Sequence, residues 1–170
     1  MLRPAVRALL ADAWGIAAET SGARAAKARP VAIGWATVEL DRAASELADA
    51  LGLGSGEQAF RDAPRSIALG CACRIASGVL PNGGSLLVLE PDTEGRLASA
   101  LARLGEGPVA VWLVPEAPTA TPRALHATGF TLSSERDGPL GPERLIVGDP
   151  AAGRLLLLLA FGRATGTIRS

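Results

Sequence analysis

The feature of this sequence that most constrains its fold is a short apolar segment that occurs twice. The letters PVAIGW begin at Pro30, and the letters PVAVWL begin at Pro108, about 78 residues further on. Each copy opens a β-rich run and is followed by residues with helical spacing and then by further apolar strands. This internal repeat predicts a folded α/β protein built from two copies of one small strand-helix-strand module.

The first copy reads in order as a strand, a helix and two more strands. Residues 30–40 are the β-rich run, and apolar residues recur every fourth position through a helix over 42–51, with Asp41 as the expected N-cap. The letters SIALGCACRIA, at 66–76, predict one apolar strand. The letters PNGG follow and predict a hairpin turn into the strand SLLVLEP, because Asn and Gly tolerate positive φ angles.

The second copy follows a connecting helix, which is expected over residues 93–104 with Asp92 or the next residue as its cap. The helix of the second copy is expected to start at Thr121, with proline at its first helical position, and to end near Gly129. The strands ERLIVGD and GRLLLLLAF then close the module.

An additional helix is predicted at the N-terminus, where apolar residues recur at helical spacing over residues 1–19. The Ser-, Gly- and Ala-rich stretch after it is interpreted as a linker. The predicted organisation is an N-terminal helix and linker over 1–29, a first module over 30–92, a connecting helix over 93–107, a second module over 108–162 and a tail over 163–170.

The composition is that of a folded protein with no excess charge. Of 170 residues, 48% are apolar and 20% charged, and the formal net charge is zero, so neither nucleic acid nor an acidic membrane surface is an expected partner. The longest apolar run, Leu155 to Phe161, is far shorter than a membrane-spanning helix requires. Cys71 and Cys73 are expected to stay reduced, because two residues so spaced along one strand lie near the limit for a disulfide. We therefore expect a cytoplasmic protein.

Three segments resemble one known family, the vicinal-oxygen-chelate superfamily, which includes glyoxalase I, bleomycin-resistance proteins, extradiol dioxygenases and methylmalonyl-CoA epimerase. The letters LLVLEPDTEGRLASALARLGEGPVAVWLV are most similar to the epimerase-like members. The letters IGWATVELDRAASEL and VGDPAAGRLLLLLAF are similar to that family's opening strand and helix and to its closing hairpin. The resemblance covers residues 30–161 and implies an α+β fold in which two paired βαβββ modules form a cupped mixed sheet, with the N-terminal helix as an addition.

The same resemblance places the family's four metal ligands on alkyl side chains. The opening-strand His, the Gln or Glu, the second His and the closing Glu fall on Ala32, Leu87, Ala110 and Leu157. Divalent cations need nitrogen, oxygen or sulfur donors, and these four side chains offer none. We therefore expect no metal, no other cofactor and no metal-dependent chemistry in the cup, which is the concave face between the two modules.

Strand alternation sorts the residues that are expected to face the cup. Within SIALGCACRIA, the small residues and Arg74 are assigned to the cup, whereas the bulkier set that includes Cys71 and Cys73 is assigned to the helix side. The ligand-binding candidates are Ala32, Gly34, Ala36, Arg74, Leu87, Leu89, Ala110, Trp112, Leu155 and Leu157. One interpretation is an apolar pocket in which Trp112 stacks on a ligand and Arg74 anchors its anionic or carbonyl group. The alternative is that these faces pack together, and the sequence does not separate the two.

Three functions are compatible with these residues. The first is a metal-independent, glyoxalase-like protein that binds an apolar or aromatic small molecule in the cup without turning it over. The second is a metal-independent isomerase or lyase acting on a small carbonyl or acyl substrate, with Arg74 as electrophile and Glu90 as base. Alternation places Glu90 on the face opposite Leu87 and Leu89, which favours a surface role at the end of its strand. The third is a non-catalytic module whose N-terminal helix and leucine-rich faces form an oligomer interface, such as that of a homodimer. His126, the one histidine, is better explained as a surface residue than as a catalytic group.

Overall fold

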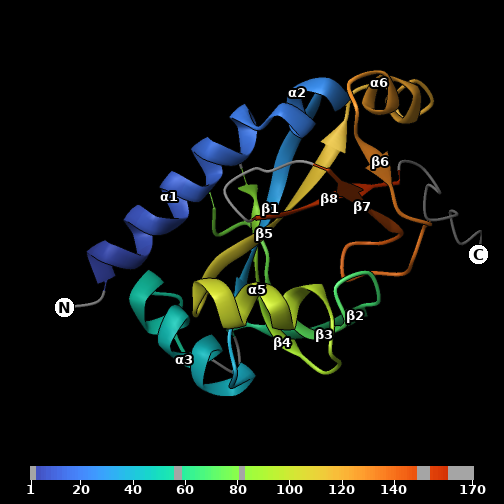
Figure 1. Cartoon of the computed structure of the whole chain (residues 1–170). Coiled ribbons are helices and arrows are strands. Elements are labelled where there is room, and N and C mark those ends of the chain that lie inside the picture. The colour runs from blue at the N-terminus through green and yellow to red at the C-terminus, as the bar shows by residue number, and fades with distance from the viewer. Residues whose placement is uncertain (1–2, 56–58, 81–82, 149–153, 161–170) are drawn as a thin grey trace, which may run out of the picture.

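Eight strands form one continuous sheet in the computed structural model, which describes residues 3–55, 59–80, 83–148 and 154–160 (Figure 1). The helices are α1 (Arg3–Glu19), α2 (Ser21–Ala26), α3 (Leu40–Leu51), α5 (Arg96–Leu104) and α6 (Thr121–Ala127). The strands are β1 (Ala28–Ala36), β2 (Arg61–Ser66), β3 (Cys71–Ala76), β4 (Ser85–Pro91), β5 (Gly107–Pro115), β6 (Thr131–Leu132), β7 (Glu143–Val147) and β8 (Leu155–Leu159).

Two copies of one βαβββ unit lie side by side in this sheet. The first runs through β1, α3, β2, β3 and β4, and the second runs through β5, α6, β6, β7 and β8. The strand order is β2-β3-β4-β1-β5-β8-β7-β6, so the two halves meet at the antiparallel pair of β1 and β5. Within each half the first strand pairs in parallel with the last. The predicted fold class, two paired βαβββ modules in a mixed sheet with an extra N-terminal helix, is therefore confirmed.

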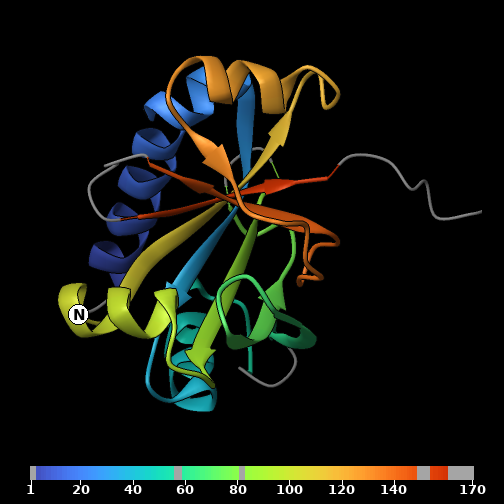
Figure 2. The same cartoon turned by 45° about the vertical axis from the view of Figure 1, so that its right-hand side comes forward.

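Alternation of side chains along the strands divides the core between the two faces of the sheet. On the concave face, the cup, one cluster of buried apolar residues spans both modules and includes Leu87, Trp112 and Leu157. On the convex face, one cluster lies under α1 and α3, and another lies under α2 and α6. Figure 2 shows the strands of both halves converging at the centre of the molecule, with α1 along one side and α6 at the top.

Helix α1 packs on the first module through an apolar stripe. Val6, Leu10 and Ala13 recur at helical spacing and are buried in the cluster that contains the apolar residues of α3. The guanidinium of Arg7 donates to the carbonyl of Leu51, at the end of α3, at 2.7 Å. The N-terminal helix predicted from the sequence is therefore present and lies against the sheet. Among the described residues, no helix is both long enough and apolar enough to cross a bilayer.

The stretch interpreted as a linker contains a short helix. Residues Ser21–Ala26 form α2, because the hydroxyl of Thr20 accepts from the N–H of Ala23 at 3.1 Å and caps the helix start. Lys27 ends the helix with a φ angle of 47°, and β1 begins at Ala28. The linker interpretation is wrong because alanine, which fills half of this helix, favours helix more than any other residue.

The segment predicted as one strand over 66–76 is the end of one strand, a turn and a second strand. Strand β2 ends at Ser66, the chain turns with Gly70 at a φ angle of 68°, and β3 begins at Cys71. The sequence pattern does not predict β2, because it is an edge strand with mostly exposed side chains and contains Pro64.

Two helices begin differently from the prediction. The backbone N–H of Leu40, at the start of α3, donates to Oε2 of Glu90 at 2.6 Å. The acceptor for this free N–H group of the helix is therefore the carboxylate of Glu90 on β4, and not that of Asp41. Helix α5 starts beyond Asp92, whose carboxylate pairs with Arg65. Helix α6 begins at the predicted position, with proline in its first turn.

Part of the PNGG turn, most of the turn before β8 and the tail after residue 162 lie outside the described residues.

Candidate functional site

Most of the ligand-binding candidates lie together in the cup, as the strand alternation predicts for them. The fully buried members are Ala32, Gly34, Ala36, Leu87, Leu89, Ala110, Trp112 and Leu157. Leu155 lies at the margin of the same cluster and is half-buried. The positions that correspond to metal ligands carry only alkyl groups, so they do not fit the divalent ion that the resemblance implies. Within the described part of the chain, no group of three or more His, Cys, Asp or Glu side chains could hold a metal ion.

Side chains fill the centre of the cup. A Cβ atom added to Gly34 in β1 would lie 2.5 Å from Cδ1 of Leu89 and 2.8 Å from Cζ3 of Trp112, closer than atoms in contact can approach. The methyl group of Ala110, the partner of Gly34 on β5, is 3.1 Å from the same point. The indole of Trp112 therefore lies against the bare backbone of Gly34. At its centre the cup fits the interpretation in which the apolar faces pack together.

One carboxyl group joins the two modules across the filled cup. Glu143 is the first residue of β7 and is fully buried. Its Oε2 accepts a hydrogen bond from Nε1 of Trp112 at 2.6 Å, and its Oε1 accepts from the hydroxyl of Ser66, at the end of β2 in the other module. Both carboxyl oxygens therefore have a donor, as buried polar groups normally do. Sequence reasoning missed this residue because a glutamate at the start of a strand normally faces solvent.

The loop between β6 and β7 covers this carboxyl group. Arg136 and Glu143 exchange both backbone hydrogen bonds, at 2.9 and 2.8 Å, which folds the loop back onto β7. A Cβ atom added to Gly138 would overlap the carboxyl group of Glu143, so a larger residue at this point of the loop would have to displace that side chain. The N–H of Ile67 donates to the carbonyl of Asp137 at 3.1 Å and ties the loop to the first module.

Burial controls the protonation of Glu143. Because a charged group is poorly solvated inside the protein, burial raises the pKa of this carboxyl group, and the hydrogen bonds from Ser66 and Trp112 partly oppose the rise. A carboxyl group with a raised pKa in a cup is a candidate for proton transfer. Since the side chain has no exposed surface and both its oxygens are bound, it can reach a substrate only if the loop that contains Gly138 moves.

Cys71 and Cys73 face the cup, contrary to the face predicted for them. Both are buried in the cup cluster, and their sulfur atoms lie 3.8 Å apart. The prediction assumes that the bulkier residues of this strand turn towards the helices, whereas Cys73 pairs with Leu89 and shares its face. The hydrogen bond with Cys73, together with burial, raises the pKa of the Cys71 thiol. Such a thiol is unreactive at neutral pH and acts as a small core residue.

Arg74 and Glu90, the two catalytic candidates, lie on the convex face of the first module. Nη2 of Arg74 lies 2.9 Å from Oδ1 of Asp41 on α3. Glu90 accepts the hydrogen bond from Leu40 described above, at the start of the same helix. The assignment of Arg74 to the cup is therefore wrong, because the true alternation along β3 points its side chain at α3. Both residues attach α3 to the sheet and neither faces the cup.

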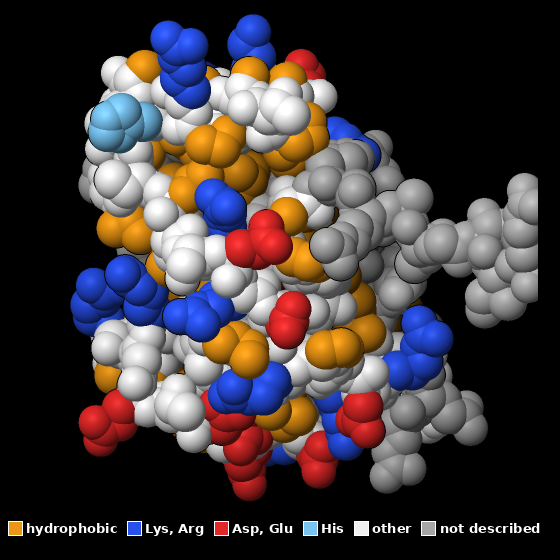
Figure 3. All heavy atoms as spheres, turned by 90° about the vertical axis from the view of Figure 1, so that its right-hand side faces the viewer, with side chains coloured by type: hydrophobic (Ala, Val, Ile, Leu, Met, Phe, Trp, Pro, Cys, Tyr) orange, Lys and Arg blue, Asp and Glu red, His pale blue; other side chains and the backbone are white. Residues whose placement is uncertain are grey.

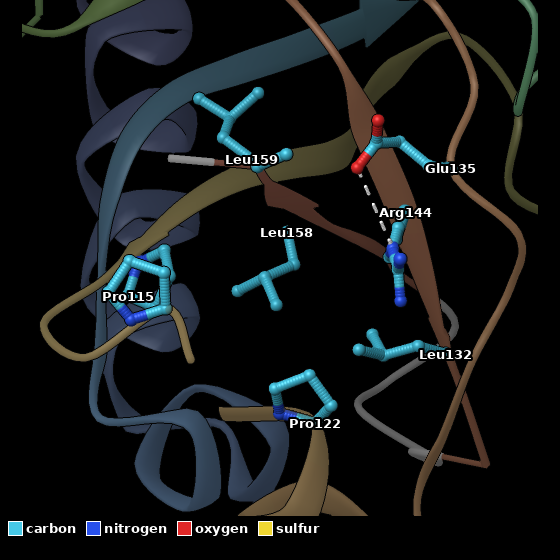
Figure 4. Close-up of a pocket in the computed structure, with 9 residues that line it drawn as sticks. Pro115, Pro122, Leu132, Glu135, Arg144, Leu158 and Leu159 are labelled. Carbon is cyan, nitrogen blue, oxygen red and sulfur yellow. Dashed lines mark ion pairs between the residues drawn. The ribbon is translucent and has the colours of Figure 1, made fainter. Parts of the chain in front are cut away.

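A pocket of about 200 Å³ lies at the edge of the second module. It is bounded by the ends of β5 and β8, by β6 and by the first turn of α6, which is only seven residues long and leaves this part of the sheet uncovered. Leu132, Leu158 and Pro122 form apolar walls around the central space (Figure 4). Figure 3 shows hydrophobic side chains around a hollow on this side of the molecule, with acidic and basic side chains beside it.

Arg144 supplies the cationic group of this pocket. It is paired with Leu158 in the register of β7 and β8, so the two side chains lie on the same face of the sheet. Its Nε lies 4.0 Å from Oε2 of Glu135, and the described residues offer it no shorter ion pair. The two side chains are 39% and 49% exposed, and a pair this long in contact with water contributes little stability. The guanidinium therefore keeps hydrogen-bond donors available to a ligand.

The pocket thus combines apolar walls with one arginine, as the sequence predicts for the cup, but it lies elsewhere, and its lining residues include Glu135 and no aromatic residue. Sequence reasoning missed it because its walls come from several elements of the second module, between residues 115 and 160, whose side chains meet only in the folded sheet. The one available signal is Arg144 itself, a charged residue inside the apolar run of β7 that must face away from Glu143 and Leu145.

The architecture is similar to that of several solved structures. Methylmalonyl-CoA epimerase from Mycobacterium tuberculosis aligns with a TM-score of 0.59 and 21% identity, over 76% of this chain and 85% of that one. A Streptomyces coelicolor methylmalonyl-CoA epimerase in complex with 2-nitronate-propionyl-CoA aligns with a TM-score of 0.57 and 22% identity, over 76% and 94% of the two chains. A hypothetical protein from Bacillus halodurans aligns with a TM-score of 0.60 and 13% identity, over 82% and 99%.

These likenesses support the vicinal-oxygen-chelate resemblance at the level of the fold. No sequence-family model matches the chain, and no curated protein matches it. At identities of 13 to 22%, the structural likeness establishes how the chain is folded and leaves its activity to be argued from its own side chains.

Proposed function

We propose that this chain is a metal-independent binding protein of vicinal-oxygen-chelate fold, and that it holds a small carboxylate with an apolar body in the pocket at Arg144. The observation that carries the proposal is the guanidinium of Arg144, which lines a pocket with leucine and proline walls and whose ion pair with Glu135 is 4.0 Å long. Carboxylates bind arginine through two parallel hydrogen bonds, which a distant and exposed partner does not prevent.

The size and walls of the pocket support a small, largely apolar ligand. A volume of about 200 Å³ is below the ~300 Å³ at which sites for drug-sized molecules begin. Leu132, Leu158 and Pro122 would contact the apolar part of the ligand while Arg144 binds its carboxylate (Figure 4). An arylacetate or a branched short-chain acid has this combination of size and charge.

The filled cup supports binding in this pocket in preference to the cup. The indole of Trp112 lies where a ligand would have to sit above Gly34, and the carboxyl group of Glu143 is already bound at both oxygens. The cup would therefore have to lose packing and hydrogen bonds before it could accept a molecule, whereas the pocket at Arg144 is open.

Titration with phenylacetate tests the proposal. We expect millimolar or tighter binding by calorimetry, and a loss of about tenfold or more in affinity in Arg144→Gln, because a hydrogen-bonded charge pair is removed. Arg103→Gln is the matched control, since it removes the same charge from an exposed position on α5 outside the pocket. Equal affinities for phenylacetate and neutral benzyl alcohol, or an unchanged affinity in Arg144→Gln, would reject this site.

A second candidate function is isomerisation of an acyl thioester, with Glu143 as the group that moves the α-proton. It is favoured by one observation, a buried carboxyl group of raised pKa inside the cup of a fold shared with methylmalonyl-CoA epimerases. Incubation with methylmalonyl-CoA in D₂O distinguishes it from simple binding. Deuterium incorporation at the α-carbon that is absent in Glu143→Gln would place catalysis in the cup, and no incorporation would remove this candidate.

A further inference from the structure

A second pocket, of about 250 Å³, lies on the other side of the molecule between α1 and α3. These two helices lie next to each other on the convex face of the first module (Figure 1). Val6 and Leu9 of α1, Leu47 of α3 and Trp35 of β1 form its apolar walls. Leu9 remains 48% exposed beside the opening, and the indole of Trp35 is half-buried. The helix that the sequence adds to the two modules therefore creates an accessible apolar cavity.

The charged residues of this pocket are all acidic. Glu46 and Glu106 are among the residues that line it, whereas no lysine or arginine of the described chain does so. Both carboxylates are paired with one arginine, Arg42, which lies 3.0 Å from Oε2 of Glu46 and 2.6 Å from Oε1 of Glu106. Arg42 is also 2.8 Å from Oε2 of Glu39, so a single guanidinium faces three carboxylates.

This arrangement leaves an excess of negative charge at the edge of the pocket. A hydrogen bond from the hydroxyl of Thr37, with further contributions from the N–H of Val38 and from Arg42, lowers the pKa of Glu106. Glu106 is therefore ionised at neutral pH, and one arginine cannot neutralise it together with Glu39 and Glu46. A cation near the pocket would be attracted to this charge.

We infer that the pocket between α1 and α3 binds an organic cation that carries an apolar body, such as an aromatic or branched alkyl ammonium. The apolar body fits against Val6 and Leu47, and the ammonium group lies towards the indole of Trp35 and the carboxylates of Glu46 and Glu106. Tryptophan is the side chain that best stabilises a quaternary ammonium group, because the face of its ring is electron-rich. This site is independent of the pocket at Arg144, which lies on the other module and has the opposite charge preference.

Benzyltrimethylammonium is the probe for this site, and the indole N–H signal of Trp35 is the readout. The chain has three tryptophans, and Trp35→Phe assigns the signal that belongs to the pocket. We expect titration to shift this signal while the signal of Trp112, buried in the cup, stays constant. Glu46→Gln should weaken binding about threefold to tenfold, as loss of an electrostatic partner of a partly exposed cation does.

Asp49→Asn is the matched control, because it removes the same charge from an exposed position one turn further along α3, outside the pocket. Its affinity for the probe should equal that of the unmodified chain. Benzyl alcohol controls for apolar contact alone, and equal binding of the cation and this neutral analogue would overturn the inference. An unshifted Trp35 signal at saturating probe, or equal weakening in Asp49→Asn and Glu46→Gln, would also overturn it.

The two pockets can be tested separately in one set of samples. Phenylacetate binding should respond to Arg144→Gln and not to Glu46→Gln, whereas benzyltrimethylammonium binding should respond in the opposite way. Failure of phenylacetate alone therefore rejects the proposed function and leaves the cation site standing. Failure of the ammonium probe alone rejects the cation site.

Discussion

The indole N–H of Trp112 donates to Oε2 of Glu143 at 2.6 Å, and this hydrogen bond joins β5 to the start of β7 across the cup. Trp112 belongs to β5, in the middle of the sheet, and Glu143 begins β7, near one edge. Because the hydroxyl of Ser66 in the other module donates to the same carboxyl group, Glu143 holds together two edges of a curved sheet. The indole ring fills the centre of the cup, and the loop between β6 and β7 covers the carboxyl group to which it donates.

The first prediction concerns the stability that this carboxyl group provides. Glu143→Ala should lower the free energy of unfolding by about 3 kcal/mol, because two buried donors lose their acceptor and a cavity opens. Glu143→Gln keeps an oxygen for Trp112 and an amide for the hydroxyl of Ser66, so it should stay within about 1 kcal/mol of the unmodified chain. Urea unfolding at pH 7 measures both. Equal losses in the two variants would contradict the assigned hydrogen bonds.

The second prediction is a pH dependence that comes from the raised pKa of Glu143. Above the ordinary value of 4.5, the unfolded chain releases this proton while the folded chain still holds it. The folded state then binds more protons, so the free energy of unfolding falls as the pH rises from 4.5 to the raised pKa and is constant above it. Relative to Glu143→Gln, the unmodified chain should lose stability across this window. A flat difference between the two unfolding curves from pH 4 to pH 8 would contradict the raised pKa.

Glu106 should show the opposite sign, which is the third prediction. Its pKa lies below the ordinary 4.5, because Thr37, Val38 and Arg42 favour its charged form. Its contribution to stability is therefore complete above 4.5 and is lost as the pH falls through the lowered value. Glu106→Gln should be less stable than the unmodified chain at pH 7, and the difference should shrink in acid. Urea unfolding at pH 3, 5 and 7 measures this difference in free energy of unfolding. A difference that stays the same at the three pH values would contradict the lowered pKa of Glu106.

The sequence predicts the structural features that depend on local patterns, and it does not predict those that depend on contacts between distant segments. The repeat at Pro30 and Pro108 predicts the two modules, because each copy repeats the same order of strands and helix. The assignment of Ala32, Leu87, Ala110 and Leu157 to one face follows from the family resemblance together with strand alternation, and all four are buried in one cluster.

The errors arise where the chain departs from regular alternation or where distant segments meet. Because the turn at Gly70 falls inside an apolar run, the sequence does not show where β3 starts. The assumption that bulky residues face the helices then places Arg74, and not Cys73, in the cup. The burial of Glu143 depends on Ser66, which is 77 residues away in the sequence, and no local pattern reports such a contact. The same holds for the pocket between α1 and α3, whose lining residues run from Ala5 to Glu106.

A fourth prediction follows from the alkyl groups at the four positions of the cup. Addition of EDTA, or of Zn²⁺, Ni²⁺ or Mn²⁺ at low micromolar concentration, should leave the melting temperature unchanged, because a side chain of Ala or Leu cannot coordinate them. Differential scanning fluorimetry measures this directly. A rise of several degrees with one of these ions would contradict the prediction.

The fifth prediction compares two glycines whose surroundings differ completely. Gly34→Ala should lower the free energy of unfolding by about 1–3 kcal/mol, because the added methyl group would lie 2.5 Å from Leu89 and 2.8 Å from Trp112, both of which are locked in a filled core. Gly15→Ala is the same chemical change in the middle of α1, where nothing lies within 4 Å of the new methyl group, and it should raise stability by up to about 1 kcal/mol through helix propensity. Urea unfolding of both variants decides between a filled and a roomy cup. A destabilisation by Gly34→Ala of less than about 0.5 kcal/mol would mean that Trp112 can move aside, and the cup would then return as a place where a small molecule binds.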